Sequence, residues 1–399
     1  SRPRKGWSSM SRRPIALSPD LLRLQNEGYD IEIRDGFLLV RDVPYVDSTG
    51  SLQRGILISR LELSGDVTVK PKDHVAYWTG AHPCHSDGRK ITSIQNGSAP
   101  QDFGNGVKAD FTFSAKADYR DYHHKMTTYI ARITGEATKI DADVTARTYP
   151  PVPADGEASV FQYEDTATSR AGIGAVNARI GGQRLGILGL GGTGAYILDL
   201  VTKTAAAEIR IIDGDVFSQH NAFRAPGAAS LEELAARPRK VSYLAARYGH
   251  MHKGIVAHDV FIDESNVALV DGLDFVFLCL DRGPVKRAVV ERLVANGTPF
   301  IDVGMGVVLN DGQLGGIVRL TMSAPETRDQ AAPHISFADD DGGANEYATN
   351  IQIAELNALN ACLAVLRWKQ YFGIYRDGRN NFYAGFSIGT GEIVQEAAG

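Results

Sequence analysis

The sequence contains few cysteines, and their spacing excludes two common kinds of site. Only three occur among 399 residues, at Cys84, Cys279 and Cys362. They form neither a disulfide framework nor a CxxC pair. We therefore expect no structural zinc, and we expect a reducing compartment, most simply the cytoplasm.

Long apolar runs and an excess of positive charge are also missing. No segment approaches the roughly 18 apolar residues that a membrane-spanning helix needs. The 42 basic and 47 acidic residues give a net charge of -5, so the composition does not indicate a nucleic-acid partner. Residues 1–14 carry five basic residues and no acidic one, and no apolar signal core follows. We predict a flexible basic tail there, and neither a membrane nor a nucleic-acid partner.

What is present divides into two parts. The segment YPPVPADGEA (149–158) holds three prolines and has the composition of a linker, which we place at 149–157. Before it, residues 15–148 read as a helix opened by Ser18, several strand-like runs and an amphipathic helix at 119–137. This pattern predicts a smaller α+β domain.

Residues 158–399 have a different pattern, in which apolar strands alternate with helices. Strands are expected at LGILGL, EIRIIDGD, IVAHDV, DFVFLCLD and TPFIDVGMG, and Pro238 is expected to interrupt the helical stretch SLEELAARPRKVSYLAARYG. Near-continuous apolar strands that alternate with helices are typical of a doubly wound, mostly parallel sheet. The predicted class of this domain is α/β, and Rossmann-like.

The stretch RLGILGLGGTGAYILDL (184–200) runs from the first of these strands through a glycine-rich turn into a helix. Such glycines let the backbone approach phosphate oxygens, which the free N–H groups of the helix N-terminus then bind. The turn glycines are Gly189, Gly191, Gly192 and Gly194. Asp213 ends the next strand, where an acid can hold the ribose hydroxyls. Up to this point the residues fit a dehydrogenase and an ATP-dependent enzyme equally well.

The residues that follow favour a triphosphate. Asn221 and Arg224 come just after Asp213, and Lys240 lies on the next helix. A dinucleotide has only a pyrophosphate to neutralise, whereas charge develops on a leaving pyrophosphate when a triphosphate reacts. Asp281 ends the strand DFVFLCLD at the carboxyl edge of the sheet, where it can hold Mg²⁺ against phosphates. The alternative is that Arg224 and Lys240 are solvated charges and Asp281 is a helix cap.

Together these motifs resemble the adenylation domain of the ThiF/MoeB and ubiquitin-activating enzyme superfamily. The matching segments are GLGGTG (189–194), IIDGDVFSQHNAFRAPG (211–227), Lys240 and CLD (279–281), and the resemblance covers roughly residues 163–320. In this family an Asp precedes an Arg by eleven residues, as Asp213 precedes Arg224 here. Asp215 and Asn221 also match the pattern.

The resemblance implies a role for each matching residue. The four turn glycines line the phosphates, Asp213 holds the ribose and Asp215 lies beside it. Asn221, Arg224 and Lys240, or Arg239 in place of Lys240, contact the triphosphate. Asp281 positions Mg²⁺. Arg170 matches an arginine that enters the active site of the partner subunit, which implies a homodimer.

The implied reaction is the activation of a carboxylate with ATP and Mg²⁺. In the family the substrate is the C-terminal glycine of a ubiquitin-like protein, which becomes an acyl-adenylate with release of pyrophosphate.

The cysteine that usually takes over the acyl group is not evident. Cys279 is expected inside a buried strand, and Cys362 shares a helical stripe with three leucines, which predicts that it packs in the core. The acceptor would then be a hydroxyl, an amine or a separate partner.

The N-terminal domain is similar to a ubiquitin-conjugating fold over a helix, three strands and HPCHSDGRKITSI (82–94). The position of the catalytic cysteine is held here by Thr92, with Ser93 beside it, and Cys84 replaces an asparagine. The domain could be an inactive binding module, or Thr92, Ser93 or Cys84 could accept the acyl group, or the similarity could be accidental.

The combination of the two domains resembles proteins from bacterial operons for ubiquitin-like conjugation, some of which are antiviral. This resemblance implies a conjugating-enzyme-like partner.

Two other functions fit parts of the sequence. A nicotinamide-dependent oxidoreductase could use the same glycine turn, although neither a Tyr-x-x-x-Lys motif nor a His–Asp pair is evident. A scaffold that binds a ubiquitin-like protein without turnover would also retain the fold. Preference for NAD over ATP would favour the first, and binding without pyrophosphate release would favour the second.

Overall fold

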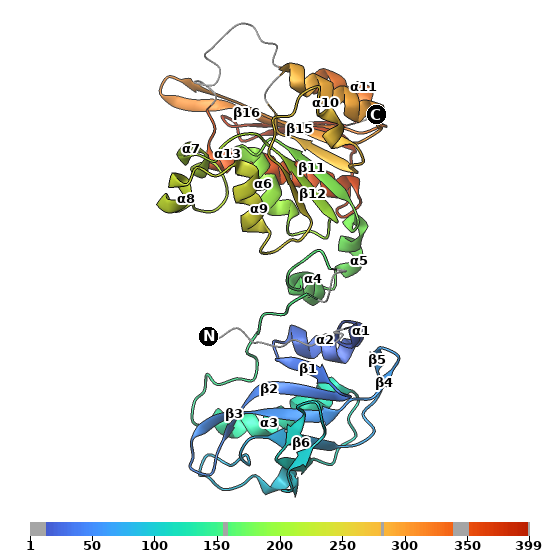
Figure 1. Ribbon diagram of the computed structural model, residues 1–399, viewed down its shortest axis with the longest axis vertical. Helices are drawn as coiled ribbons and strands as arrows, with labels where there is room; N and C mark the ends of the chain where they lie inside the picture. The colour runs from blue at the N-terminus through green and yellow to red at the C-terminus, as the bar shows by residue number, and fades with distance from the viewer. Residues whose placement is uncertain (1–12, 155–158, 281–282, 338–350, 398–399) are drawn as a thin grey trace. The chain divides into compact units, whose positions relative to one another are not determined.

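The computed structural model describes residues 13–154, 159–280, 283–337 and 351–397. These residues form two compact units (Figure 1). Within the described ranges, unit 1 contains the residues up to 159 together with 163–170, and unit 2 contains 160–162 and everything from 171 onward. Each unit has its own hydrophobic core, so each is a domain in the physical sense.

Unit 1 is built on a six-stranded antiparallel sheet with the strand order β1-β2-β3-β6-β10-β7. Its strands are β1 (Ile31–Arg34), β2 (Phe37–Val46), β3 (Leu52–Arg60), β6 (Val75–Thr79), β7 (Gln95–Gly97) and β10 (Phe111–Ser114). Two small hairpins, β4 (Leu63–Ser64) with β5 (Val67–Thr68) and β8 (Gln101–Asp102) with β9 (Lys108–Ala109), are attached to it. Its helices are α1 (Arg13–Leu17), α2 (Pro19–Asn26), η1 (Thr92–Ile94), α3 (Tyr122–Ala137) and α4 (Thr166–Ala171).

The sequence explains the main features of unit 1. Asp35 and Gly36 both have positive φ, 49° and 74°, and make the tight turn between β1 and β2 that the Asp-Gly pair favours. Tyr122, Met126, Tyr129 and Ile133 recur at helical spacing on α3 and are fully buried in the core. The predicted smaller α+β domain is confirmed in its class.

The segment after this sheet crosses between the two units. At its start, the backbone N–H of Tyr149 donates to Gly28 O at 3.0 Å, within unit 1. Residues 160–162 pair with unit 2, where Gln162 N donates to Met251 O at 2.8 Å. Residues 163–170 return to unit 1, and Glu164 N donates to Val152 O at 2.8 Å. The last residues of the predicted linker, 155–157, lie outside the described residues.

Unit 2 contains an eight-stranded sheet with the order β13-β12-β11-β14-β15-β16-β17-β18. The first five strands are parallel, and β15 to β18 are antiparallel. The strands are β11 (Arg184–Leu188), β12 (Glu208–Ile212), β13 (Ile255–His258), β14 (Phe275–Leu278), β15 (Phe300–Asn310), β16 (Gln313–Ser323), β17 (Asn381–Ser387) and β18 (Ile393–Ala397). The predicted parallel strands are all present, whereas β16 to β18 were not predicted.

Helices cover both faces of this sheet (Figure 1). Residues of α6, α9 and α13 share one core cluster with the sheet, and residues of α10 and η3 share another. The helices are α5 (Gly174–Asn177), η2 (Ala178–Ile180), α6 (Gly192–Val201), α7 (Gln219–Ala222), α8 (Leu231–Ala235), α9 (Lys240–Tyr248), η3 (Val267–Val270), α10 (Gly283–Ala295), α11 (Arg328–Ala331), η4 (Ala332–His334) and α13 (Ala354–Tyr371). This is the doubly wound, mostly parallel α/β class that the sequence predicts.

Two details of unit 2 bear on the sequence predictions. The break expected at Pro238 is present, because α8 ends at Ala235 and α9 begins at Lys240. The predicted core position of Cys362 is wrong. Cys362 is exposed and Leu366 is 46% exposed on α13, whereas the buried face of the helix carries Ala361, Ala364, Val365 and Trp368.

Candidate functional site: a nucleotide cavity at the sheet edge

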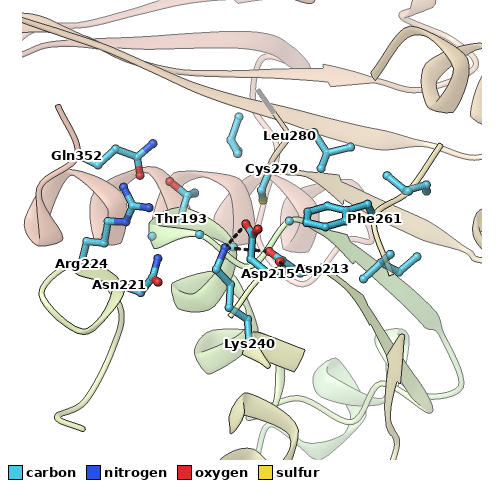
Figure 2. A pocket seen from close by; sticks show the side chains of 18 of the residues that line it. Thr193, Asp213, Asp215, Asn221, Arg224, Lys240, Phe261, Cys279, Leu280 and Gln352 are labelled. Atoms are coloured by element: carbon cyan, nitrogen blue, oxygen red, sulfur yellow. Dashed lines mark hydrogen bonds and ion pairs between the residues drawn. The ribbon is translucent and has the colours of Figure 1, made fainter. Parts of the chain in front are cut away.

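A cavity of about 640 Å³ lies in unit 2, at the carboxyl ends of β11, β12 and β14 and beside residues 303–305 of β15. In an open parallel sheet this edge is where ligands bind. Figure 2 shows side chains from α9, from the turn after β12 and from the segment after β14 converging on it. The four turn glycines, Asp213, Asp215, Asn221, Arg224 and Lys240 all line this cavity. The structure thus brings together the described residues for which the sequence predicts nucleotide contacts.

The glycine turn needs its glycines for two different reasons. At Gly189 φ is +87°, and a Cβ would lie 2.5 Å from Cys279 O. At Gly194 a Cβ would lie 1.9 Å from Gly189 O, so a side chain there would break the turn itself. A Cβ on Gly191 would meet nothing within 4 Å, because this residue faces the cavity at the start of α6. Gly191 therefore leaves room for a ligand, while Gly189 and Gly194 let the chain turn.

Asp213 holds the turn in place. One carboxylate oxygen, Oδ2, accepts a hydrogen bond from the backbone N–H of Leu190 at 2.7 Å. The other, Oδ1, accepts from the N–H of Asp215 at 2.8 Å. These bonds fix the position of the carboxylate at the end of β12, where it lines the cavity. A fixed carboxylate of this kind can accept hydrogen bonds from the hydroxyls of a ribose.

Lys240 is the cation nearest to this carboxylate. It is 6% exposed, and its ammonium group lies 2.8 Å from Asp215 Oδ2 and 3.4 Å from Asp213 Oδ2. Figure 2 shows the side chain rising from α9 toward both acids. Arg239, the alternative to Lys240, also lines the cavity, but its guanidinium forms an exposed ion pair with Asp259 at 2.7 Å. The geometry therefore favours Lys240 as the phosphate-binding cation.

Asn221 and Arg224 are positioned by the short helix α7. Asn221 is 3% exposed, and its Oδ1 accepts a hydrogen bond from Ser218 N at 2.8 Å, which fixes the start of α7. Arg224 follows that helix and extends toward Gln352 and Thr193 (Figure 2). Its Nε atom is buried and has no hydrogen-bond partner among the described residues. A buried donor without a partner is costly, so an anionic ligand at this point would stabilise it.

His220 is a neighbour of these cations. Burial, together with Arg224 and Lys240, lowers the pKa of His220, which also lines the cavity. A lowered pKa favours the neutral imidazole near pH 7, so His220 adds no further positive charge there. The arginine and lysine side chains that line the cavity are Arg224, Arg239 and Lys240.

The other end of the cavity is apolar, which the sequence did not indicate. Val260, Phe261 and Ile262 follow β13, and Leu280 and Val285 lie around the end of β14 and the start of α10. Phe261 projects beside Asp213 (Figure 2). An apolar wall next to a ribose-binding acid is suited to a planar base. These residues come from two separate segments, around 260–262 and 280–285, so no local pattern could have identified them.

A third region of the lining consists of Val303, Gly304 and Met305 on β15, with Gln352 and Asn360. Asn360 is 1% exposed, and its Nδ2 donates to Gly304 O at 3.2 Å. Its Oδ1 is buried without a hydrogen-bond partner among the described residues. These residues belong to the same cavity as the glycine turn and the apolar wall.

Cys279 also lines the cavity, which corrects its predicted position. It follows β14 by one residue and is partly buried, so it does not lie inside the strand as expected. Asp281, the predicted magnesium ligand, lies outside the described residues. Within the described part of the chain, no group of three or more metal-ligating side chains is found.

The remaining predicted residues lie in unit 1. Arg170 is on α4, where its guanidinium lies over the ring of Tyr149, 5.4 Å from the centroid. Thr92 and Ser93 are exposed in η1. Cys84 is 1% exposed, its thiol donates to His82 O at 3.2 Å, and burial raises its pKa. The structure thus contradicts Cys84 as an acyl acceptor, since a buried thiol with a raised pKa is a poor nucleophile.

The fold and the cavity define a nucleotide-binding α/β domain, and comparison with known families identifies it. The ThiF family matches residues 168–388, more than half of the chain, so the chain belongs to the ThiF family. A domain of unknown function, DUF6791, matches residues 19–166. The family match begins within α4, so its first residues lie in unit 1.

Several solved structures are similar to this chain, and no curated protein matches it. E. coli MccB with MccA-N7isoASN has 16% identity over 58% of this chain and 68% of that chain, with a TM-score of 0.44. E. coli MccB with ATP has 17% identity over 58% and 67%, also with a TM-score of 0.44. PaaA has 16% identity over 56% and 75%, with a TM-score of 0.42. Among the described residues, no helix has the length and apolar character needed to cross a membrane.

Proposed function

We propose that this protein uses ATP to adenylate the C-terminal carboxylate of a ubiquitin-like protein. Membership in the ThiF family supports an ATP-dependent adenylating enzyme. The observation that carries the proposal is the position of two cations, Arg224 and Lys240, beside the glycine turn in one cavity. A dinucleotide enzyme needs the turn, but it has no leaving pyrophosphate to neutralise.

The proposed reaction follows from the weak electrophilicity of a carboxylate. A carboxylate oxygen attacks the α-phosphorus of ATP, a new P–O bond forms, and the bond to the β-phosphate oxygen breaks. The products are an acyl-adenylate and pyrophosphate, which keeps the electron pair of the broken bond. No covalent enzyme residue is required, so the protein acts by alignment and by stabilising charge.

Each part of the cavity has a role in this scheme. Phe261 and its apolar neighbours receive the base, Asp213 receives the ribose, and the N-terminus of α6 receives phosphate oxygens. Arg224 and Lys240 stabilise the negative charge that accumulates on the leaving pyrophosphate. We assign Mg²⁺ to the phosphates together with Asp281, where it would lower the repulsion between the carboxylate and the triphosphate.

We make further proposals about the assembly of the protein and about its pathway. We propose a homodimer in which Arg170 acts at the partner's site, and a bacterial ubiquitin-like conjugation pathway with a role in antiphage defence.

Transfer of the acyl group through Thr92 or Ser93 would give an ester. In that case, mass spectrometry would find an adduct that hydroxylamine removes and that is lost in Thr92→Ala/Ser93→Ala. Absence of any adduct would leave direct transfer from the adenylate to a separate conjugating-enzyme-like partner.

The deciding experiment is calorimetry of ATP–Mg²⁺ against NAD, on wild type and on Arg224→Ala. Micromolar binding of ATP that the variant loses is the expected result. Pyrophosphate exchange with the cognate modifier should then be abolished in Arg224→Ala and in Asp281→Ala without a change in melting temperature. Preference for NAD would overturn the proposal in favour of an oxidoreductase. Binding of ATP and modifier without exchange would indicate an inactive scaffold.

A further inference from the structure

The first turn of α6 forms the wall of the cavity where we propose that phosphates bind. Gly191 is the N-cap residue and makes no side-chain hydrogen bond, and Gly192, Thr193 and Gly194 follow it along the wall. A helix without a side-chain cap leaves its first backbone N–H groups to a ligand. This turn is held from its sides, by Asp213 at the end of β12 and by a residue of α13.

The residue of α13 that holds the turn is Asn357, which is 0% exposed. A Cβ on Gly192 would lie 2.2 Å from Asn357 Nδ2, so the two helices approach closely only because Gly192 has no side chain. Asn357 Oδ1 lies 2.8 Å from Thr193 Oγ1, and its Nδ2 lies 3.1 Å from Ile353 O, one turn earlier on α13. A buried amide is costly unless both of its ends are hydrogen-bonded, as they are here.

The direction of the hydrogen bond between Thr193 and Asn357 follows from the chemistry of the groups. Ile353 O is a backbone carbonyl, which can only accept, so the amide must direct its Nδ2 group toward it. The other end of the amide, Oδ1, then faces Thr193, whose hydroxyl must donate. A hydroxyl has a single proton. Toward the cavity, which Thr193 lines, the threonine oxygen therefore offers only lone pairs.

An acceptor in this place suits Arg224. Figure 2 shows Arg224 extending toward Thr193, and both residues line the cavity. The Nε atom of Arg224 is buried and has no hydrogen-bond partner among the described residues, so the guanidinium has unused donors. A guanidinium can only donate, and the oxygens of a triphosphate accept. A threonine whose proton is held by Asn357 can bind the guanidinium and does not compete with it for phosphate oxygens.

From these observations we propose that Asn357 is a positioning residue of the phosphate site, which acts through Thr193 on Arg224. Asn357 holds the hydroxyl proton of Thr193, and the threonine oxygen accepts a hydrogen bond from one N–H group of the Arg224 guanidinium when a triphosphate is bound. The remaining donors of Arg224 are thereby directed at the phosphates. The inference rests on the proposed adenylation, because that reaction places a triphosphate at this end of the cavity.

A double-mutant cycle tests the pair. Thr193→Val removes the hydroxyl and Asn357→Leu removes the amide, while each keeps the branched shape of its side chain. Each single change leaves a buried polar group without its partner, so both should lower the melting temperature, and the double variant should recover most of that loss. Calorimetry should show roughly tenfold lower affinity for ATP–Mg²⁺ in all three variants, because each disrupts the same hydrogen bond to a charged group.

Three controls separate positioning from a purely structural role. Adenosine has no phosphates, so its affinity should stay within about twofold of wild type in all three variants. Thr193→Ser keeps the hydroxyl and should retain the affinity of wild type for ATP. Thr202→Val is the matched variant at the other end of α6, where Thr202 is also fully buried and its hydroxyl donates to Asp199 O at 3.0 Å. It should lower the melting temperature without weakening ATP binding.

Several outcomes would contradict the positioning role. These are losses that add in the double variant, a double variant that recovers ATP affinity together with stability, and an adenosine affinity that falls as far as that for ATP. Unchanged ATP binding in Thr193→Val would also contradict it, and that variant decides the question if Asn357→Leu does not fold.

The proposed function can fail separately. Wild type that binds NAD in place of ATP would overturn adenylation, and the variants would then be measured with NAD, whose pyrophosphate would use the same turn. Coupled losses of NAD affinity would leave the positioning role of Asn357 in place, whereas unchanged NAD affinity would remove it as well. Binding of neither nucleotide would overturn both proposals.

Discussion

The carboxylate of Asp213 accepts a hydrogen bond from the backbone N–H of Leu190 at 2.7 Å, and this bond joins the two parts of the nucleotide site. Leu190 lies in the glycine turn after β11, and Asp213 ends β12, the neighbouring parallel strand. The acid for which we propose ribose binding therefore also fixes the turn for which we propose phosphate binding. Because a preorganised site needs no rearrangement when the ligand binds, this bond should contribute to affinity as well as to stability.

Two alanine substitutions in the turn should separate folding from binding. Gly194→Ala places a Cβ 1.9 Å from Gly189 O, so we expect a loss of stability of at least about 1–3 kcal/mol. Gly191→Ala meets nothing within 4 Å and has a φ of -67°, which alanine adopts readily. It should melt like wild type but bind ATP weakly, because its Cβ occupies space that the phosphates need.

Melting curves and calorimetry on these two variants provide the measurement. Tight ATP binding by Gly191→Ala would mean that the phosphates do not approach this turn.

Lys240 and Arg239 can be distinguished by a matched pair of methionine substitutions. Lys240→Met removes a buried cation that contacts Asp213 and Asp215, and we expect ATP affinity to fall about 10- to 100-fold, the usual range for a charged hydrogen bond. Arg239→Met removes a cation that also lines the cavity but is already paired with Asp259 in an exposed ion pair, and we expect less than a threefold change. Equal losses in both variants would contradict the assignment of Lys240.

The three cysteines should react in a fixed order with a maleimide at pH 7.5. Cys362 is exposed and should react first, whereas Cys84 is buried, has a raised pKa and should react only on unfolding. Cys279 lines the nucleotide cavity, so saturating ATP–Mg²⁺ should slow its labelling. Peptide mass spectrometry over time measures all three rates. Rapid labelling of Cys84 in the folded protein, or no protection of Cys279, would be inconsistent with the structure.

Acid should destabilise unit 1 partly through Glu136. Hydrogen bonds from Lys139 and His85 lower the pKa of Glu136 from its ordinary 4.5 to about 2. A carboxylate whose pKa is lower in the folded state contributes stability that is present above pH 4.5 and is lost as the pH falls toward 2. Between these values the melting temperature of wild type should fall more steeply than that of Glu136→Gln, which has no proton to take up. Parallel curves for the two proteins would exclude this contribution.

Much of the fold could be predicted because its signals are local. The alternation of apolar strands with helices, the glycine turn and the break at Pro238 each depend on neighbouring residues. The nucleotide residues from Gly189 to Lys240 occupy one continuous βαβ stretch, so their spacing reflects their geometry. The strand β16 had a local signal that the sequence analysis did not use, because Asp311 and Gly312, with φ of 49° and 76°, form the tight turn that joins it to β15. The pairing of β16 with β17 has no such signal, because it joins segments about sixty to seventy residues apart.

The errors have equally physical causes. A helical stripe shows that residues share a face, but not which face is buried, and α13 places Cys362 on its exposed side. Residues 163–170 fall within the predicted 158–399 domain, yet in the structure they belong to unit 1, where Asn26 and Ser169 are hydrogen-bonded at 3.1 Å. Adjacency in sequence does not decide which core a short helix joins.

The sequence by itself determined the α/β class, the glycine turn and the acid, amide and cations that follow it, because each of these depends on spacing within one unit of supersecondary structure. Only the tertiary structure decided that Lys240 contacts Asp213 and Asp215 while Arg239 pairs with Asp259, that Phe261 provides the apolar wall of the cavity, and that part of β15 lines it. These relations join residues from separate elements. They depend on how strands are ordered and where each one ends, which no local pattern encodes.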